Sequence, residues 1–278
     1  MFEQYKNDKF DVIIMAGQSN ACGSGLGHEE DAYTPVADVF MLTNPYSADI
    51  AETAYGKQYL DIKYSDKFEI EQAYENEFDD KFGAKGCLAY SFSEEYIKNR
   101  LKDGRKILII KTAIGGTGYA RNHWGVGDDL YERMIKMTKM ALDINPENKL
   151  VAVLWHQGEH DSFENEQLND KERFDFYYEK FSQMLKALRK EFGVVPFIGA
   201  GFTKKWYEDY KNQCDAVYGA TEKVFSENAQ CAFIKETADL KCNNDIFGNN
   251  DIVHFCKKDL YELGRRYYTA YENILNKL

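Results

Sequence analysis

The sequence predicts an α/β fold in which a parallel β-sheet carries helices on both faces. Five short apolar runs have the composition of buried strands, and the segments between them place apolar residues three and four positions apart, as amphipathic helices do. Strands that alternate with helices favour a parallel sheet, because each crossover helix packs on one face of it. With 278 residues and no internal repeat, the chain is expected to form one domain over residues 1–278.

The individual elements follow from periodicity and from helix stop signals. Strands are expected at residues 10–14, 106–111, 150–155, 194–200 and 231–235, and helices at 88–101, 128–144, 166–192, 206–227 and 259–278. Gly193 and Pro196 follow the longest helix, as is usual where a helix ends. A polar loop at 243–251 precedes the short apolar segment 252–255, which the last helix follows.

A long insert is predicted at about residues 24–86. This stretch is polar and irregular, with Pro35 and Pro45 as breakers, but it is too aromatic to be disordered outright. Long segments without regular structure in compact domains are often functional. Because the insert leaves the chain beside Ser19, it is expected to influence substrate choice together with the loop at 117–127.

Composition excludes several classes of function. The net charge is −11, so nucleic acid and anionic membrane surfaces are not expected as partners. The six cysteines are scattered without CxxC spacing, which predicts free thiols in a reducing compartment. The N-terminal residues have no apolar signal region and no later segment could span a membrane, so a cytoplasmic location is expected, with a removed secretion signal as the alternative. The oligomeric state is left open.

Four blocks with chemically useful residues follow predicted strands. Because the carboxyl ends of parallel strands meet at one edge of the sheet, where such folds bind ligands, these blocks are expected to converge. They are 17–20 (Gly-Gln-Ser-Asn), 115–118 (Gly-Gly-Thr-Gly), 155–161 (Trp-His-Gln-Gly-Glu-His-Asp) and 251–254 (Asp-Ile-Val-His).

The four blocks together provide the groups that acyl transfer requires. Ser19 is the predicted nucleophile, His254 the base, and Asp251 the acid that orients the imidazole from three residues away. Oxyanion donors would be the backbone N–H groups of Ser19 and Gly116 and the side-chain amide of Gln157.

These blocks, in this order, resemble the SGNH/GDSL hydrolase superfamily. The resemblance is closest to the branch that holds the sialic-acid-specific acetylesterases and the acetylxylan esterases of carbohydrate esterase family 6. It spans residues 17–254 and implies a three-layer α/β/α sandwich with a flavodoxin-like, five-stranded parallel sheet. It also implies that O-acetyl groups are removed from a carbohydrate, such as a xylo-oligosaccharide or a sialic acid, through an acyl-serine intermediate and without a cofactor. The same catalytic and oxyanion roles follow for the matching residues.

Five other residues are candidate substrate contacts or supports of the site. Gln18 and Asn20 flank the nucleophile. Arg121 is either a carboxylate-binding residue or an ordinary surface arginine, and Trp124 either stacks on a sugar or belongs to the core. Glu159 is expected to hydrogen-bond the neighbouring loops, with direct assistance to His254 as the alternative.

Two other classes of function remain as alternatives. His156 and His160 match the HxxEH pattern of one class of zinc peptidases, but that chemistry needs a helix, and Gly158 interrupts the block directly after a strand. No metal is therefore expected. The other alternative is a carbohydrate-binding domain that kept the fold without catalysis, which the complete set of Ser19, Asp251 and His254 argues against.

Overall fold

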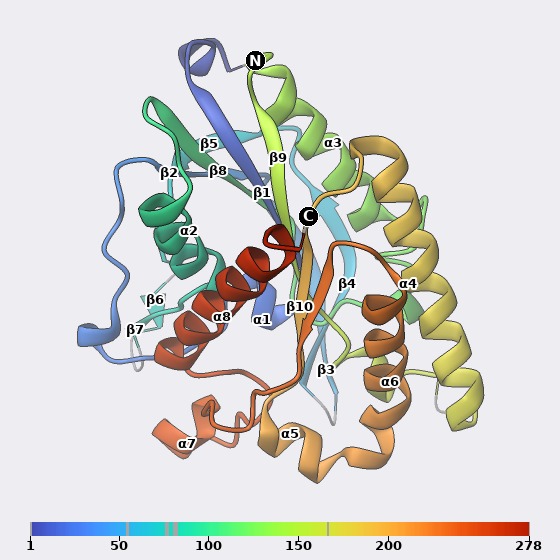
Figure 1. The fold of residues 1–278 in the computed structure, drawn as a ribbon. Helices are drawn as coiled ribbons and strands as arrows, with labels where there is room; N and C mark the ends of the chain where they lie inside the picture. The colour runs from blue at the N-terminus through green and yellow to red at the C-terminus, as the bar shows by residue number, and fades with distance from the viewer. Residues whose placement is uncertain (1, 54–55, 76–77, 80–82, 166, 278) are drawn as a thin grey trace.

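The chain folds around one large sheet with helices on both faces (Figure 1). The structure, a computed structural model, describes residues 2–277 except 54–55, 76–77, 80–82 and 166. The large sheet has seven strands in the order β11-β10-β9-β1-β8-β2-β5. All neighbouring strands are parallel except β2 and β5. The strands are β1 (Lys9–Gly17), β2 (Val39–Thr43), β5 (Glu69–Gln72), β8 (Arg105–Lys111), β9 (Lys149–His156), β10 (Phe197–Ala200) and β11 (Cys231–Ile234).

The predicted α/β class is confirmed, and all five predicted strands are present as β1, β8, β9, β10 and β11. The predicted number of strands is wrong, because β2 and β5 extend the sheet to seven. Both come from the insert, which was expected to be irregular. The run Val39–Thr43 is short, and its pairing with the buried strand β8 supplies the stability that local sequence does not.

The insert also forms two small antiparallel pairs. These are β3 (Tyr46–Thr53) with β4 (Gly56–Tyr64), and β6 (Phe78–Asp79) with β7 (Gly83–Ala84). The segment 252–255, before the last helix, belongs to no strand of the described chain. Phe255 forms an isolated antiparallel bridge with Cys242 there.

Helices cover both faces of the sheet. On one face lie α2 (Leu88–Asn99) and α8 (Lys257–Leu275), and on the other α3 (Asp129–Asp143), α4 (Asp170–Phe192) and α6 (Lys211–Glu227). Shorter helices are α1 (Ser19–Cys22), α5 (Lys204–Asp209) and α7 (Asn243–Phe247). Single 3₁₀ turns lie at Glu3–Tyr5, Glu29–Asp31, Tyr119–Arg121 and Asp161–Phe163.

The five predicted helices are present with small differences at their ends. The segment 206–227 is divided at Tyr210 into α5 and α6. Helix α4 begins at Asp170 because Asn169 forms a capping box with Glu172. Glu166 and Leu278, the predicted ends of two helices, lie outside the described residues. None of the helices in the described part of the chain is long and apolar enough to cross a membrane.

The central strand β1 is fixed from both sides. Its side chains alternate between the two cores, with Val12 and Ile14 facing α3 and α4, and Ile13 and Met15 facing α2 and α8. All four are fully buried, and β1 pairs with β8 on one side and with β9 on the other. The end of β1, where Ser19 follows, is therefore held in a rigid position.

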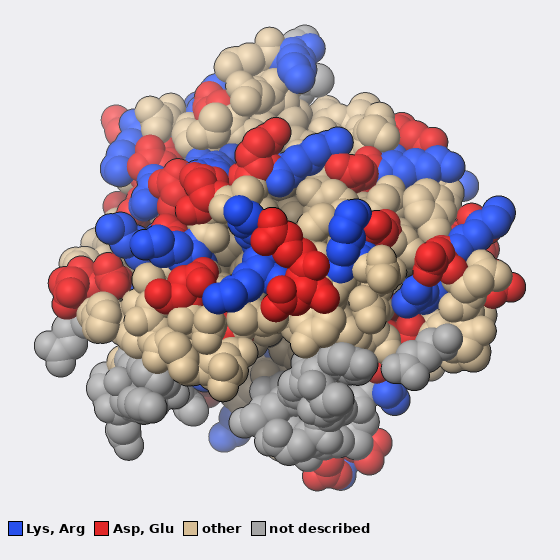
Figure 2. Space-filling view, turned by 90° about the horizontal axis from the view of Figure 1, so that it is seen from below, with Lys and Arg blue, Asp and Glu red and all other residues tan. Residues whose placement is uncertain are grey.

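Figure 2 shows the surface of the molecule from below, relative to the view of Figure 1. Among the residues coloured there, lysine and arginine side chains alternate with aspartate and glutamate. The described part of this face therefore carries no continuous basic area of the kind that binds phosphate backbones.

Candidate active site

Ser19 lies at a sharp turn directly after the central strand. Gly17 has a φ of +123°, and a Cβ there would lie 2.0 Å from the backbone oxygen of His156, so only glycine fits. The backbone N–H of Gln18 donates to that same oxygen at 2.9 Å. Ser19 is the first residue of α1 and is partly exposed, and the first N–H groups of a helix have no partner within it. The turn thus presents both a hydroxyl and a backbone donor.

Gln18 fastens this turn to the loop after β9. Its Oε1 accepts hydrogen bonds from the backbone N–H groups of Gly158 at 3.2 Å and His160 at 3.1 Å. The side chain is buried, so Gln18 supports the site from within the protein.

Asn20 connects the same turn to the segment that carries His254. Its Nδ2 donates to Oε1 of Glu159 at 2.7 Å and to the backbone oxygen of Val253 at 3.0 Å. Its Oδ1 accepts from the backbone N–H of Phe255 at 3.2 Å. Asn20 therefore binds the residue before and the residue after His254, which brings residues more than 230 positions apart to one place.

His254 and Asp251 form the predicted acid–base pair. Nδ1 of His254 lies 2.9 Å from Oδ2 of Asp251, and both side chains are partly exposed. Burial alone would raise the pKa of Asp251, but His254 and the amide of Asn243 outweigh it and hold that pKa below its usual value. Asp251 is therefore a carboxylate that accepts from His254 Nδ1, which leaves Nε2 free to take a proton.

Ser19 and His254 are not yet joined by a hydrogen bond. In the described part of the chain, no such bond links Ser19 Oγ to the imidazole. Contacts of this kind are often long in a free enzyme and tighten when substrate binds.

Asn243 is a residue of the site that the sequence analysis missed. It is fully buried, and its Nδ2 donates to Oδ2 of Asp251 at 2.8 Å and to the backbone oxygen of Ser24 at 3.0 Å. Its Oδ1 accepts from the N–H of Leu26 at 2.9 Å, so it ties the start of the insert to Asp251. An asparagine in a polar loop gives no periodic signal, and only its long-range contacts reveal this role.

Gly116 lies on the loop after β8, next to the end of β1. The backbone N–H of Ile114 donates to the backbone oxygen of Gly17 at 3.3 Å, which draws this loop alongside the nucleophile turn. Gly116 is partly exposed and has a φ of +65°. The loop that carries Gly116 therefore lies beside the turn that carries Ser19.

Gln157 sits deeper than the motif suggested. Its Nε2 has three acceptors within reach, which are Oδ2 of Asp161 at 2.7 Å, the backbone oxygen of Thr117 at 3.2 Å and Oε1 of Gln18 at 3.3 Å. Its Oε1 accepts from the hydroxyl of Tyr177 at 2.7 Å. Both N–H groups of the amide are therefore engaged, and an oxyanion could bind Gln157 only if one of these bonds opened.

Asp161 fixes the loop that follows the Gly116 block. Its two carboxylate oxygens each accept, at 2.9 Å, from the backbone N–H groups of Tyr119 and Ala120. Together with its bond to Gln157, these contacts let Asp161 join the neighbouring loops and hold that amide.

Of the two roles considered for Trp124, the structure supports the core role. The side chain is fully buried, its Nε1 donates to Oγ1 of Thr117 at 3.2 Å, and its ring packs edge-on against Trp155. Arg121 is more exposed and forms an ion pair with Glu164 at 3.0 Å.

The two histidines of the HxxEH pattern point to different partners. His156 ends β9 and contacts the hydroxyl of Tyr267, whereas His160 contacts Glu164 at 3.2 Å. Across the described residues, no group of three or more His, Cys, Asp or Glu side chains is arranged to hold a metal ion. The pattern therefore reflects a strand end followed by a turn.

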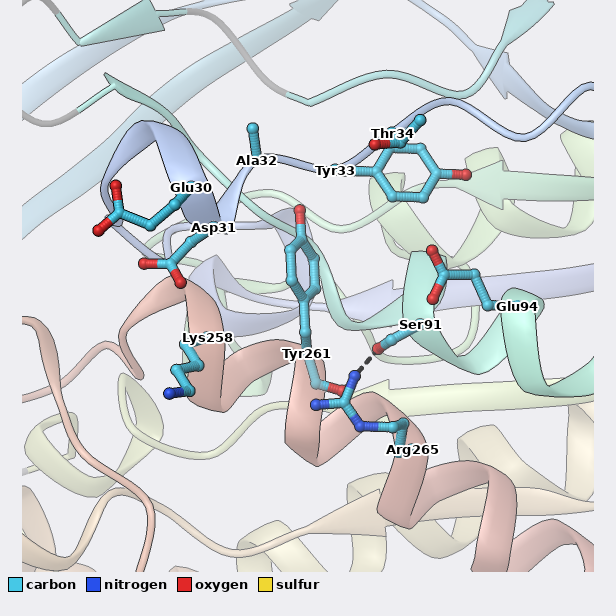
Figure 3. A pocket seen from close by; sticks show the side chains of 10 residues that line it. All are labelled: Glu30, Asp31, Ala32, Tyr33, Thr34, Ser91, Glu94, Lys258, Tyr261 and Arg265. Carbon is cyan, nitrogen blue, oxygen red and sulfur yellow. Dashed lines mark hydrogen bonds between the residues drawn. The ribbon is translucent and has the colours of Figure 1, made fainter.

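A separate hollow of about 240 Å³ lies between the loop at 30–34 and helices α2 and α8 (Figure 3). Two cations, Lys258 and Arg265, face three carboxylates across it, so it carries little net charge. Neither Ser19 nor the Asp251–His254 pair lines this hollow.

The open, mainly parallel sheet with helices on both faces places the chain in the SGNH-like class of α/β folds. The family model described as "Carbohydrate esterase, sialic acid-specific acetylesterase" matches residues 9–273, and the chain belongs to this family.

Curated relatives and a solved structure agree with this assignment. The chain is 26% identical over 138 residues to a protein of Escherichia coli (strain K12) described as "Probable 9-O-acetyl-N-acetylneuraminic acid deacetylase". The aligned region covers 43% of this chain and 42% of that protein. It is 36% identical over 118 residues to the Arabidopsis thaliana protein "Probable carbohydrate esterase At4g34215", which covers 39% and 42%. The chain thus matches about two fifths of the length of each curated relative.

The fold is also that of the crystal structure of NanS. The two structures align with a TM-score of 0.69 at 18% identity, over 98% of this chain and 99% of that one. At this identity the likeness concerns the fold.

Proposed function

We propose that the protein is a serine esterase that removes O-acetyl groups from a carbohydrate through an acyl-serine intermediate. The observation that carries this proposal is that Asn20 hydrogen-bonds the backbone on both sides of His254 and so holds the Asp251–His254 pair beside the turn of Ser19. Membership of a carbohydrate esterase family supports the same chemistry.

The reaction would proceed in two halves. His254 Nε2 takes the proton of the Ser19 hydroxyl while Oγ attacks the acetyl carbonyl, and the imidazolium then gives that proton to the departing sugar oxygen. In the second half, a water molecule gives its proton to His254 and attacks the acyl-serine, which releases acetate and restores the hydroxyl. Asp251 holds Nδ1 of the imidazole throughout.

Two backbone donors would stabilise the oxyanion. They are the N–H groups of Ser19 and Gly116, both partly exposed residues, and each such donor is worth about 3 kcal/mol of barrier. Gln157 would act indirectly, because its amide hydrogen-bonds Gln18 and Thr117, the neighbours of Ser19 and Gly116 in the chain.

The substrate would be an O-acetylated sialic acid or a neutral acetylated sugar such as a xylo-oligosaccharide. The names of the family and of the Escherichia coli relative favour the sialic acid. Arg121 is the cation that a sialic acid carboxylate would meet in place of Glu164. Arg121→Gln should then raise KM for the sialic acid ester and leave KM for the neutral sugar unchanged.

The test is steady-state hydrolysis by wild type and Ser19→Ala, with a chelator present. The substrates are 4-nitrophenyl acetate, an O-acetylated sialic acid and an acetylated xylo-oligosaccharide. We expect Ser19→Ala to lower kcat by about 10⁴-fold or more. Undiminished hydrolysis by Ser19→Ala would refute the serine mechanism, and a folded wild type without any hydrolysis would favour a carbohydrate-binding domain.

A further inference from the structure

Asn20 is buried at the junction of three segments. Its own segment carries Ser19, its Nδ2 reaches the loop after β9 at Glu159, and both ends of its amide reach the backbone around His254. Three hydrogen bonds from one amide group to surrounding residues hold the side chain in a single orientation. The relative position of the nucleophile and the base therefore depends on how firmly Asn20 is oriented.

Glu159 and His156 form a buried pair behind Asn20. Oε1 of Glu159 lies 3.3 Å from Nε2 of His156, and the two side chains are 1% and 0% exposed. The hydroxyl of Tyr267 donates to the backbone oxygen of Trp155 at 2.8 Å, so it can only accept from Nδ1 of His156, at 3.2 Å. Nδ1 therefore donates to this hydroxyl, and Nε2 is the ring nitrogen that faces the carboxylate.

This pair gives Asn20 a charged acceptor. Although burial by itself raises the pKa of Glu159, the nearby His156 and the amide of Asn20 outweigh it and leave that pKa below its usual value. A hydrogen bond to a carboxylate is roughly twice as strong as one to a neutral acceptor. The carboxylate therefore fixes which end of the Asn20 amide faces Glu159 and which faces Phe255.

We propose that Asn20, Glu159 and His156 form a positioning network that aligns Ser19 with His254 without touching the substrate. This role rests on the proposed esterase function. The network acts through Asn20 on both sides of His254, and Glu159 makes no hydrogen bond to His254 within the described residues. A shift of about 1 Å between two reacting groups can cost on the order of 100-fold in rate, so the alignment has a measurable consequence.

The decisive variant is Asn20→Asp. It keeps an acceptor for Phe255 N–H but turns a carboxylate oxygen toward both Glu159 and the backbone oxygen of Val253, where the structure has a donor. We expect kcat to fall about 10- to 100-fold while KM stays within about threefold, because alignment is lost and sugar contacts are kept. The rate at which a fluorophosphonate inactivates Ser19 should fall in parallel.

A second substitution should restore the lost hydrogen bond. In the double variant Asn20→Asp/Glu159→Gln, the amide at position 159 can donate to the carboxylate at position 20, so donor and acceptor are exchanged. We expect kcat to recover by about 3- to 10-fold over Asn20→Asp, the size of one hydrogen bond. The matched control is Asn145→Asp at the opposite edge of the sheet. Asn145 is also buried, with its Nδ2 on the backbone oxygen of Lys6 at 3.0 Å and its Oδ1 on the N–H of Glu147 at 2.9 Å.

The outcomes separate the network from the esterase function. A fall in kcat for Asn20→Asp with recovery in the double variant, beside an unchanged Asn145→Asp, supports the network. Wild-type kcat in Asn20→Asp, or equal losses in Asn20→Asp and Asn145→Asp without recovery, overturns it while Ser19-dependent hydrolysis stands. If wild type shows no Ser19-dependent hydrolysis, the esterase function fails first and the network with it.

A milder variant covers the case in which Asn20→Asp does not fold, as judged by circular dichroism and thermal melting. Glu159→Gln keeps a neutral oxygen for Asn20 and removes the charge, so kcat should fall about fivefold at unchanged KM. Unchanged kcat in the folded Glu159→Gln protein would overturn the network.

Discussion

Replacing Asp251 by asparagine tests the acid–base pair most directly. Oδ2 of Asp251 accepts from Nδ1 of His254 at 2.9 Å and from Nδ2 of Asn243 at 2.8 Å, and Oδ1 accepts from the backbone N–H of His254 at 3.2 Å. All three neighbours are donors. An asparagine has only one acceptor oxygen, so in either orientation its NH₂ group faces at least one donor and cannot hold the imidazole in the tautomer that catalysis needs.

The expected effect on catalysis is large. Substituting the acid of a Ser–His–Asp triad by its amide costs about 10⁴-fold in kcat, because the imidazole adopts the wrong tautomer. This corresponds to about 5.4 kcal/mol of barrier at about 1.36 kcal/mol for each factor of ten. The measurement is steady-state hydrolysis of 4-nitrophenyl acetate at neutral pH, with thermal melting to confirm that Asp251→Asn is folded.

Asp245→Asn is the matched control. Asp245 lies on α7, near Asp251 in the chain, and its Oδ2 accepts from the backbone N–H of Cys242 at 3.0 Å. Its substitution should cost about 1 kcal/mol of stability through the helix cap and leave kcat unchanged. If folded Asp251→Asn retained kcat within tenfold of wild type, the assignment of Asp251 as the partner of the catalytic histidine would be refuted.

Three further predictions concern stability. Gly17→Ala should lower the free energy of unfolding, measured by urea titration, by at least about 3 kcal/mol, because the added Cβ would lie 2.0 Å from the backbone oxygen of His156 at a φ of +123°. An unchanged urea midpoint would contradict this turn geometry. Lys257→Met should lower the free energy of unfolding by about 3–5 kcal/mol, because the carboxylate of Glu75, whose side chain is 9% exposed, loses the ammonium 3.1 Å away. Adding Glu75→Gln should recover part of this loss, and equal stabilities of the single and double variants would argue against the ion pair. The pKa of Asp251 is lowered by folding, so its stabilising contribution is present above the usual carboxyl range and is lost as the pH falls through it. The difference in unfolding free energy between wild type and Asp251→Asn should therefore shrink between about pH 5 and about pH 3, and a constant difference would speak against the lowered pKa.

Much of the architecture could be predicted from the sequence because it depends on local patterns. Apolar runs predicted five of the strands of the large sheet, including β1 and β9, and periodicity predicted the helices. A parallel sheet brings strand ends to one edge, so the order of the four blocks was enough to predict that Ser19 and His254 lie on the same side. The family assignment agrees with those blocks.

Other features depended on which partner a residue meets in three dimensions. Strand β2 forms because β8 offers it a buried edge, although its own sequence lies in a polar insert. The sequence left Trp124 either stacked on a sugar or in the core, and the fold packs it against Trp155 in the core. Neither outcome follows from residue type alone.

The difference between what the sequence determines and what the tertiary structure decides is clearest for the amide side chains around Ser19. The sequence by itself determined the strand, the turn and the types of residue that acyl transfer requires, because backbone periodicity and residue chemistry are local properties. Only the tertiary structure decided that Gln157 is enclosed by acceptors and that Asn20 binds Glu159 and Phe255, 139 and 235 positions away. An amide can donate or accept in several directions, and its role is set by the groups that the fold places around it.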